Sequence, residues 1–414
     1  KGRRVMTSPF IFNSPMPAPF AKRQAVVLAA MAVAAMTAPL AHAQQGAPTK
    51  EGAVKLAEGV VMYPSVKLSM GHDDNVRAVN TGAISSSVTV LAPQLKVEAQ
   101  NKSGLYTLSY NGAYTSYNSL STDDTNNHNL GATGAHEFSA RSRLNWSAGY
   151  QDAVDPRADA AVALIEPDQW RGQNLSAVYS YGAPQAQGRI ETGFSAARKR
   201  YQNNLTTTQN YDVNTQEVSG RYFWRVMPRT YLVAEARLGK ADYRLNTANN
   251  NTDTRLLAGI TWEATAKTTG QFKIGRQQKS FDNGSKPDTS GGTYEASVEW
   301  KPLTYSVFTL VANRSAADAL VAGAAYIQNS SLGLTWSHQW SSVMSTRVGL
   351  SNQKADYINL ARNDDTLTTS AGVSYSLGRR FALGLDLVRT DRDSTSAASA
   401  FKRNSVLVSI NATL

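Results

Sequence analysis

The segment LTTSAGVSYSLGRRFALGLDL, residues 367–387, carries an apolar or aromatic side chain at nearly every second position on both sides of a Gly-Arg-Arg turn. One face before the turn holds Leu367, Ala371, Val373, Tyr375 and Leu377, and one face after it holds Phe381, Leu383, Leu385 and Leu387. The alternate positions before the turn are small and polar. Since successive side chains of a β-strand point to opposite faces, this segment predicts a hairpin with one face in an apolar medium and the other in water.

The same period of two recurs along most of the chain. Apolar and polar side chains alternate at residues 143–151, 217–226, 255–263 and 294–301, and the charged residues always occupy the polar parity. The apolar parity shifts near Ala92 and Pro93, from Val88 and Val90 to Leu95 and Val97. A proline can disturb a β-ladder, so this shift predicts a β-bulge.

The connections between these segments fall into two classes. Eight short turns recur roughly every 40 residues: NKSG (101–104), ARS (140–142), PQAQG (184–188), MPR (227–229), KTTG (267–270), KPLT (301–304), QWSS (339–342) and GRR (378–380). Nine longer polar loops alternate with them, for example STDDTNN (121–127), LNTANNNTDT (245–254) and FDNGSKPDTSGG (281–292). Seventeen connections predict 18 strands with both chain ends on the short-turn side.

This pattern predicts an all-β fold, a closed antiparallel transmembrane β-barrel of the bacterial outer membrane with about 18 strands and both termini periplasmic. Short turns on one side and long loops on the other are typical of such barrels, and the short turns are periplasmic. A soluble propeller also has repeats of this length, but its blades bury both faces of their inner strands and would not keep charge off one parity.

Five tryptophans support the same interpretation. Each falls a few residues before a short turn, where a barrel carries its periplasmic aromatic girdle: Trp224, Trp262, Trp300, Trp336 and Trp340.

Composition and charge exclude several classes of protein. The chain has 414 residues, 42% of them hydrophobic, and no cysteine. Its negative mean hydropathy argues against a helical membrane bundle. The net charge of +11 falls to +6 when the first 43 residues are set aside, and the remaining basic residues are spread along the chain. Nucleic acid is therefore not an expected partner.

The N-terminal region predicts secretion. Lys22 and Arg23 precede an apolar stretch at 25–41, which ends in the small-x-small pattern Ala41-His42-Ala43. We expect a signal peptide with upstream residues at 1–43, a short periplasmic segment at 44–60 and the outer-membrane barrel at 61–414. A membrane anchor helix is the alternative, but the stretch is short and Pro39 interrupts it.

Catalytic chemistry has little support in the sequence. The most suggestive cluster is GHDDN, residues 71–75, where carboxylates beside a histidine could activate water or hold a cation. Asp73 and Asp74 fit a polar turn equally well. We therefore predict no enzyme activity, no catalytic residue, no metal site and no cofactor.

The charged residues on the polar parity are the predicted pore lining. They are Glu217, Arg221, Arg225, Glu235, Arg237, Arg255, Glu263, Glu295, Glu299, Arg347 and Asp386. Such mixed charge suits a hydrated polar polymer and also a nonselective porin. The longest loop, AVDPRADAAVALIEPDQW at 153–170, is the candidate constriction, and its AAVALI centre could also form a lid.

Four further segments carry a resemblance to a known family: YPSVKLSMGHDDNVRAVN (63–80), TVLAPQLKVEAQ (89–100), LYTLSYNGAYTSYN (105–118) and SAGYQDAVDPR (147–157). With them the chain resembles the outer-membrane β-barrel family called beta-barrel porin 2, whose members are commonly associated with exopolysaccharide biosynthesis and export. The resemblance implies an outer-membrane conduit that contacts lipid, carries polysaccharide and works with periplasmic export components. A general diffusion porin for small solutes remains the alternative.

Overall fold

The computed structural model describes residues 52–413 except 160–165, 266, 285 and 322. The predicted signal peptide, most of the 44–60 segment and the AAVALI stretch lie outside the described residues. Among the described residues, no helix is both long and apolar enough to cross a membrane.

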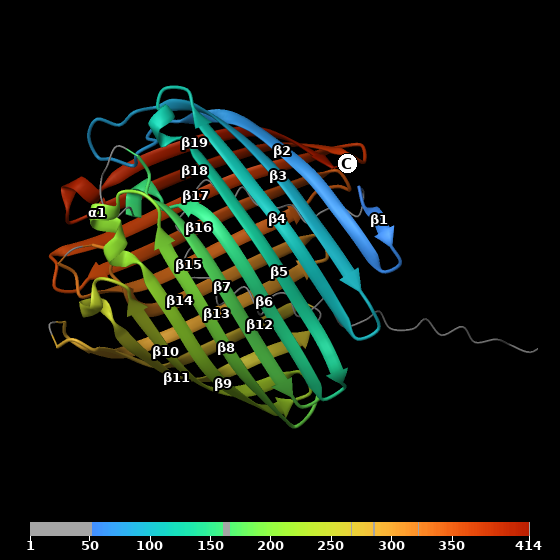
Figure 1. Cartoon of the computed structure of the whole chain (residues 1–414). Coiled ribbons are helices and arrows are strands. Elements are labelled where there is room, and N and C mark those ends of the chain that lie inside the picture. The colour runs from blue at the N-terminus through green and yellow to red at the C-terminus, as the bar shows by residue number, and fades with distance from the viewer. Residues whose placement is uncertain (1–51, 160–165, 266, 285, 322, 414) are drawn as a thin grey trace, which may run out of the picture. The chain divides into compact units, whose positions relative to one another are not determined.

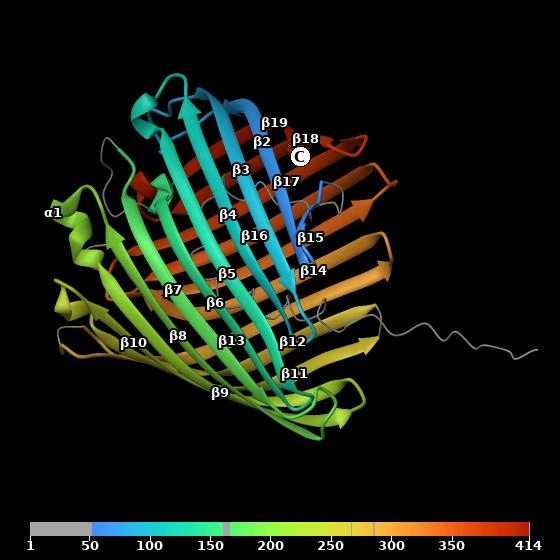
Figure 2. The same ribbon diagram turned by 45° about the vertical axis from the view of Figure 1, so that its right-hand side comes forward.

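Eighteen strands of the described part form one closed antiparallel barrel (Figures 1 and 2). They are β2 (Val60–Asp73), β3 (Ser86–Gln100), β4 (Gly104–Tyr117), β5 (Thr125–Ser139), β6 (Ser142–Val154), β7 (Gln169–Tyr181), β8 (Gly188–Tyr201), β9 (Val213–Met227), β10 (Thr230–Tyr243), β11 (Asn251–Thr265), β12 (Thr268–Phe281), β13 (Thr289–Leu303), β14 (Ser306–Asp318), β15 (Tyr326–Gln339), β16 (Met344–Tyr357), β17 (Arg362–Leu377), β18 (Phe381–Ser394) and β19 (Phe401–Thr413). Each pairs with the next, and β19 pairs with β2 to close the ring. The predicted strand number is confirmed.

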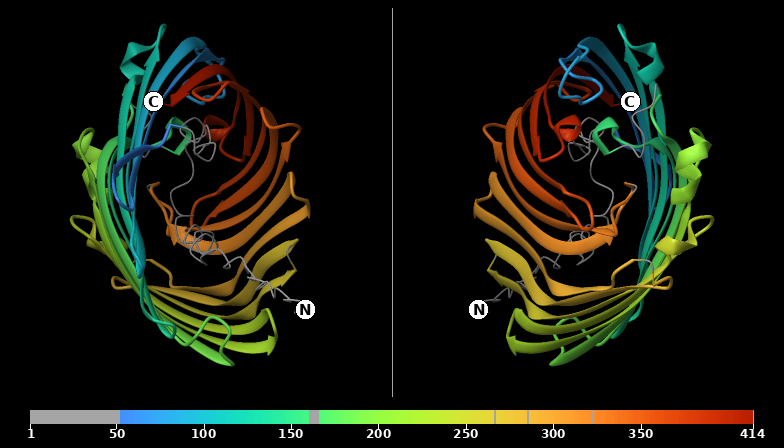
Figure 3. Two further views of the ribbon diagram at one scale, coloured as in Figure 1. Left: turned by 90° about the vertical axis from the view of Figure 1, so that its right-hand side faces the viewer. Right: turned by 90° about the vertical axis from the view of Figure 1, so that its left-hand side faces the viewer.

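The first and last strands meet side by side, as the blue and red ribbons in Figure 3 show. A short strand, β1 (Val54–Ala57), pairs antiparallel with the start of β2. Val60 pairs with Ala99, next to the β3–β4 turn, and Thr413 pairs with Ser65. Both ends of the barrel's strand set therefore lie on the short-turn side.

The eight short turns are where the sequence predicts them, but the long loops are shorter than predicted. β5 begins at Thr125, β11 at Asn251 and β13 at Thr289. The polar residues at these strand starts continue the hydrogen-bonded ladder beyond the apolar band, so they lack the alternation that marks a strand in lipid. The long loops contain short helical turns: η4 (Ser121–Asp123), η5 (Arg157–Asp159), α1 (Leu205–Thr208), η6 (Gln209–Tyr211), η7 (Thr247–Asn249) and η8 (Ala397–Ser399).

The predicted bulge at Ala92 and Pro93 is wrong. The β2–β3 register runs unbroken through Val66 opposite Pro93, and the β3–β4 register is the same before and after the proline. The parity shift has another cause, since Val88 is buried inside the barrel against Val76, Tyr117 and Leu407, with Val90 beside them. These valines are inward-facing apolar residues on a regular strand.

The two faces of the sheet differ as the alternation predicts. After the Gly-Arg-Arg turn, Phe381, Leu383, Leu385 and Leu387 are all 40–48% exposed, while Ala382, Gly384 and Asp386 on the other face are partly covered. The outward face near the short turns is aromatic: Trp336 packs in a row with Phe308 and Trp300, with ring centroids 6.2 and 5.2 Å apart. An aromatic band at this level is typical of a barrel at the membrane–water interface.

Candidate pore

The centre of one barrel wall holds a network of ion pairs around Glu235. The Glu235 side chain is completely buried and accepts hydrogen bonds from Arg237 Nε at 2.7 Å, Lys273 Nζ at 2.8 Å and Arg221 Nε at 3.1 Å. Its neighbours Ala234 and Ala236, on the alternate face, are exposed. Lipid-facing and inward-facing positions alternate along a barrel strand, so Glu235 belongs to the inner face.

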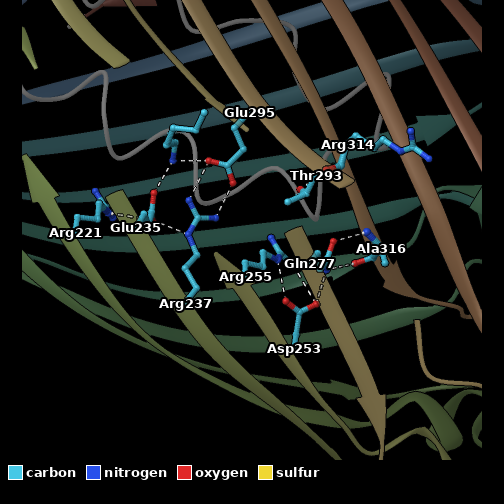
Figure 4. Close-up of polar contacts among 11 residues, drawn as sticks. Arg221, Glu235, Arg237, Asp253, Arg255, Gln277, Thr293, Glu295, Arg314 and Ala316 are labelled. Carbon is cyan, nitrogen blue, oxygen red and sulfur yellow. Dashed lines mark hydrogen bonds and ion pairs between the residues drawn. The ribbon is translucent and has the colours of Figure 1, made fainter. Parts of the chain in front are cut away.

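The network extends to strands that are not neighbours in the sheet. Arg237 on β10 donates from Nη1 and Nη2 to the Glu295 carboxylate on β13, at 2.7 and 2.9 Å (Figure 4). Lys273 Nζ on β12 lies 2.5 Å from the same carboxylate. Adjacent strands are about 4.8 Å apart, so strands three apart can bring their side chains together only across the concave side. Arg221 continues the network to Glu191 on β8, at 3.2 Å.

A second set of polar contacts lies nearer the long loops on the same wall. Arg255 Nε and Gln277 Nε2 both donate to the Asp253 carboxylate, at 2.8 and 2.5 Å (Figure 4). Lys279 Nζ is 2.6 Å from Asp318, which also accepts from Tyr243. The charges on this wall therefore neutralise one another.

The opposite wall is built differently. A cavity of about 950 Å³ is bounded by β2–β4 and β14–β19, and most inward-facing side chains along it carry hydroxyl or amide groups. Examples are Thr107, Ser109, Asn111, Ser370, Ser374 and Ser409. On its strands the charges are Lys67, which pairs with Asp386 at 3.4 Å, Lys96, which pairs with Glu98 at 2.6 Å, and Arg347, whose Nε donates to the Ser337 hydroxyl at 3.3 Å. Arg379 and Arg380 border the cavity at a short turn.

The structure brings together part of the predicted pore lining. Arg221, Glu235, Arg237 and Glu295 form the central network, with Glu217 on the same face of β9 and Arg255 in the second set. Arg347 and Asp386 border the hydroxyl-lined cavity. Three residues lie apart near the short turns: Glu299 pairs with Lys301 at 2.6 Å, Glu263 is exposed and Arg225 is half-buried.

Sequence reasoning missed Lys273, Glu191 and Gln277. A signal was present, because Lys273 stands between the outward-facing Phe272 and Ile274 and therefore has the polar parity of β12. Its position at the centre of the network depends on barrel curvature, which the alternation does not give.

The long-loop mouth is narrowed from one side by the loop after β6. Arg157 forms an ion pair with the buried Asp123 of the β4–β5 connection at 2.6 Å, and Arg392 on β18 donates to the carbonyl of Ala158 at 2.9 Å. β6 and β18 are six strands apart around the ring, so residues 157–158 extend from the end of β6 to the side of the mouth formed by β18.

A second connection, between β14 and β15, also packs inward. Ala319 and Ala324 form a buried cluster with Ala355 and Tyr357. Lys286, in the β12–β13 loop, donates to the carbonyls of Ala324 and Ala325 at 3.4 and 3.3 Å. Burial lowers the pKa of Lys286 below its usual range.

The GHDDN cluster has a structural role. Arg403 on β19 donates to the fully buried Asp73 carboxylate, with the shortest contact 2.6 Å, and Asp74 accepts from the backbone and side-chain nitrogens of Asn404, both at 2.6 Å. Within the described ranges, no group of three or more histidine or acidic side chains is placed to hold a metal ion. Both carboxylates join the first barrel strand to the last.

The family model described as "Putative beta-barrel porin 2" matches residues 59–414, which span the whole barrel. The chain belongs to this family. This beta-barrel porin 2 protein is thus an outer-membrane β-barrel channel and not an enzyme, as its sequence predicts. A search of curated protein sequences finds no match.

Solved outer-membrane barrels are similar to this porin at low sequence identity. Pseudomonas aeruginosa OccK2 (OpdF) is 12% identical with a TM-score of 0.46, covering 86% of this chain and 98% of that one. The FrpB iron transporter from Neisseria meningitidis (F3-3 variant) is 12% identical with a TM-score of 0.44, covering 80% of this chain, which spans 62% of the FrpB length. A bacterial polysaccharide outer membrane secretin is 10% identical with a TM-score of 0.37, covering 85% and 97%.

Proposed function

We propose that this porin is an outer-membrane conduit for exopolysaccharide export. The observation that carries the proposal is the inner wall, which combines a hydroxyl-lined cavity of about 950 Å³ with charges that are already paired with one another.

A polysaccharide is a hydrated chain of hydroxyl groups that cannot cross hydrocarbon. Serine and threonine hydroxyls both donate and accept hydrogen bonds. Such a wall can therefore replace water molecules that hydrate a sugar chain at little cost in free energy. Paired charges exert a weak net field, and a weak field neither traps nor rejects a polymer of low charge. Barrels of 16–18 strands enclose an aqueous channel.

The proposal includes an orientation and partners. Both termini and the short turns would face the periplasm, and the residues of the predicted pore lining would face the channel. Periplasmic export components would contact the short-turn side near 227–229, 301–304 and 378–380. A photo-crosslinker placed at Arg379, in a short turn, should then capture a periplasmic protein. A photo-crosslinker placed at Asn283, in a long loop, should not capture it.

General diffusion of small solutes is the second candidate. The contacts of Arg157 and Arg392 favour it, because a loop held toward the β18 side of the mouth narrows the passage as it does in diffusion porins.

Two measurements in one strain separate these candidates. Deleting the gene should abolish or sharply lower extracellular polysaccharide, while uptake of small sugars and antibiotics stays normal. Normal polymer with reduced solute uptake would reject export and support the porin.

Complementation with matched variants locates the effect in the channel. Ser370→Trp adds bulk to the hydroxyl-lined wall, and Leu383→Trp adds the same bulk to the outer face. Export should be restored by the wild type and by Leu383→Trp but not by Ser370→Trp. Restoration by all three would remove the inner wall from the transport path.

A further inference from the structure

The sheet opens at its long-loop end between β13 and β14. The last β13–β14 pair is Tyr294 with Arg314, although β13 remains paired with β12 as far as Thr289. Among the described residues, no backbone pairing joins the two strands beyond that point. The Thr293 hydroxyl donates to the Arg314 carbonyl at 2.5 Å and ends the seam.

The opening exists because the end of β14 is held inward. The side-chain amide of Gln277 pairs with the Ala316 backbone, accepting from its N–H at 2.8 Å and donating to its carbonyl at 3.0 Å (Figure 4). Asp318, two residues further on, is held by Lys279 on β12 and Tyr243 on β10. These inner contacts replace the missing ladder.

The outer surface beside this opening carries two exposed arginines, Arg276 on β12 and Arg314 on β14. Arg276 shares its face with the exposed Ile274, and Arg314 shares its face with Phe308 of the aromatic row. In Figure 4 the side chain of Arg314 extends away from the inner network. Both arginines therefore point outward, directly beyond the apolar band.

Two glycines lie between the arginines. Arg276 is paired with Gly292, and a side chain added at Gly291 or Gly292 would meet no atom within 4 Å. Arg276 is opposite Gly292 and Arg314 is opposite Tyr294, so two strand spacings and a two-residue offset place their Cα atoms roughly 12 Å apart across β13. Two arginine side chains can span this distance. Arg276 Nε already donates to the Ser290 hydroxyl at 2.6 Å.

Several other cations on the same rim have acidic partners on the same outer face. Arg171 pairs with Asp152 at 2.9 Å, Lys240 with Asp242 at 2.9 Å and Lys354 with Asp365 at 3.5 Å. Neither Arg276 nor Arg314 has an acidic partner within the part of the chain that the structure describes. Their positive charge is available to an external anion.

We propose that Arg276, Arg314 and the Gly291–Gly292 backbone form a binding site for the phosphate group of a membrane lipid headgroup. A guanidinium matches phosphate with two parallel hydrogen bonds, and the site lies at headgroup depth on a surface that lipid surrounds. Charge complementarity and depth both favour a lipid over a phosphate free in solution. Wherever phosphorylated glycolipid is confined to one leaflet, this site fixes the long-loop side in that leaflet.

The test uses the purified porin in phosphatidylcholine nanodiscs that contain diphosphorylated lipid A. Native mass spectrometry of the released protein should show retained lipid A on the wild type. Arg276→Gln combined with Arg314→Gln should lower the retained fraction at least tenfold, and dephosphorylated lipid should not be retained. These exposed substitutions remove the side-chain hydrogen bond from Arg276 to Ser290 but leave the backbone hydrogen bonds of the barrel in place, and gel mobility before and after heating checks the fold.

The matched control is Lys354→Gln combined with Lys240→Gln, which removes two cations from the same rim and should retain lipid A as the wild type does. Equal loss in both double variants would overturn the site in favour of general surface charge. Equal retention by wild type and the arginine double variant would also overturn it. Displacement of lipid A by millimolar inorganic phosphate would reject the lipid in favour of a free anion.

Discussion

At the scale of single residues, Glu235 determines whether the charged wall can be stable. Its side chain is fully buried among three cations, and each cation is itself largely shielded from water. A buried charge is tolerated when its partners compensate it, and removing one partner is far more costly than never having built the pair.

Glu235→Gln should therefore destabilise the barrel strongly. The substitution preserves shape but leaves Arg221, Arg237 and Lys273 without their shared carboxylate, at a cost of about 3–5 kcal/mol. Urea unfolding in detergent or vesicles measures the change. Glu299→Gln is the control, because its partially exposed pair with Lys301 should contribute at most about 1 kcal/mol; similar losses in both variants would contradict the burial argument.

At the scale of strands, β18 shows how one element faces two solvents. Leu385 is 40% exposed toward the membrane side, while its neighbour Asp386 pairs with Lys67 inside the barrel. The alternation in residues 367–387 predicts both positions.

Leu385→Arg should impair folding into bilayers by about 2–4 kcal/mol, because it places a charge near the middle of the apolar band. Asp386→Asn should be tolerated, since the inner face is hydrated. Folding yields in vesicles, read from gel mobility, compare the two. Equal tolerance would reverse the assignment of faces.

Two contacts hold residues 157–158 of the loop after β6 toward other parts of the ring: Arg157 with Asp123, and Arg392 with the Ala158 carbonyl. The base of the loop is held separately, because Asp155 accepts hydrogen bonds from Lys199 and Tyr201 on β8. Replacing both arginines with glutamine should release the loop and raise single-channel conductance in a planar bilayer. Arg389→Gln, on the outward face of β18, should leave conductance unchanged. A double variant with wild-type conductance would place the loop outside the permeation path.

At the scale of the whole molecule, most charges on the two walls of the channel are paired with one another. We therefore expect weak ion selectivity. Lys67→Gln leaves Asp386 without its partner and should shift the reversal potential in a salt gradient toward cations, whereas Asp386→Asn should shift it toward anions. Shifts of the same sign would show that these residues do not act on the permeating ions.

The sequence predicts the strand number, the turns and the two faces because each follows from local alternation. Alternation misleads at Val88, where an inward-facing apolar residue gives the same sequence pattern as a bulge. It also fails at Thr289, because the part of the strand outside the lipid has no apolar face. Contacts such as the one between Arg237 and Glu295 could not be predicted. They form only because the sheet curves and brings the side chains of strands three positions apart together on its concave side. The contact between Ala158 and Arg392 requires the closed ring itself.

The link between Asp73 and Arg403 has a consequence for assembly. The two residues are separated by 330 positions in the chain, so the ion pair cannot form until translation has passed residue 403. Local hairpins can form early, whereas contacts between distant parts of a chain form slowly. The first barrel strand therefore has an unpaired edge, which must be protected from aggregation until the last strand pairs with it and closes the barrel.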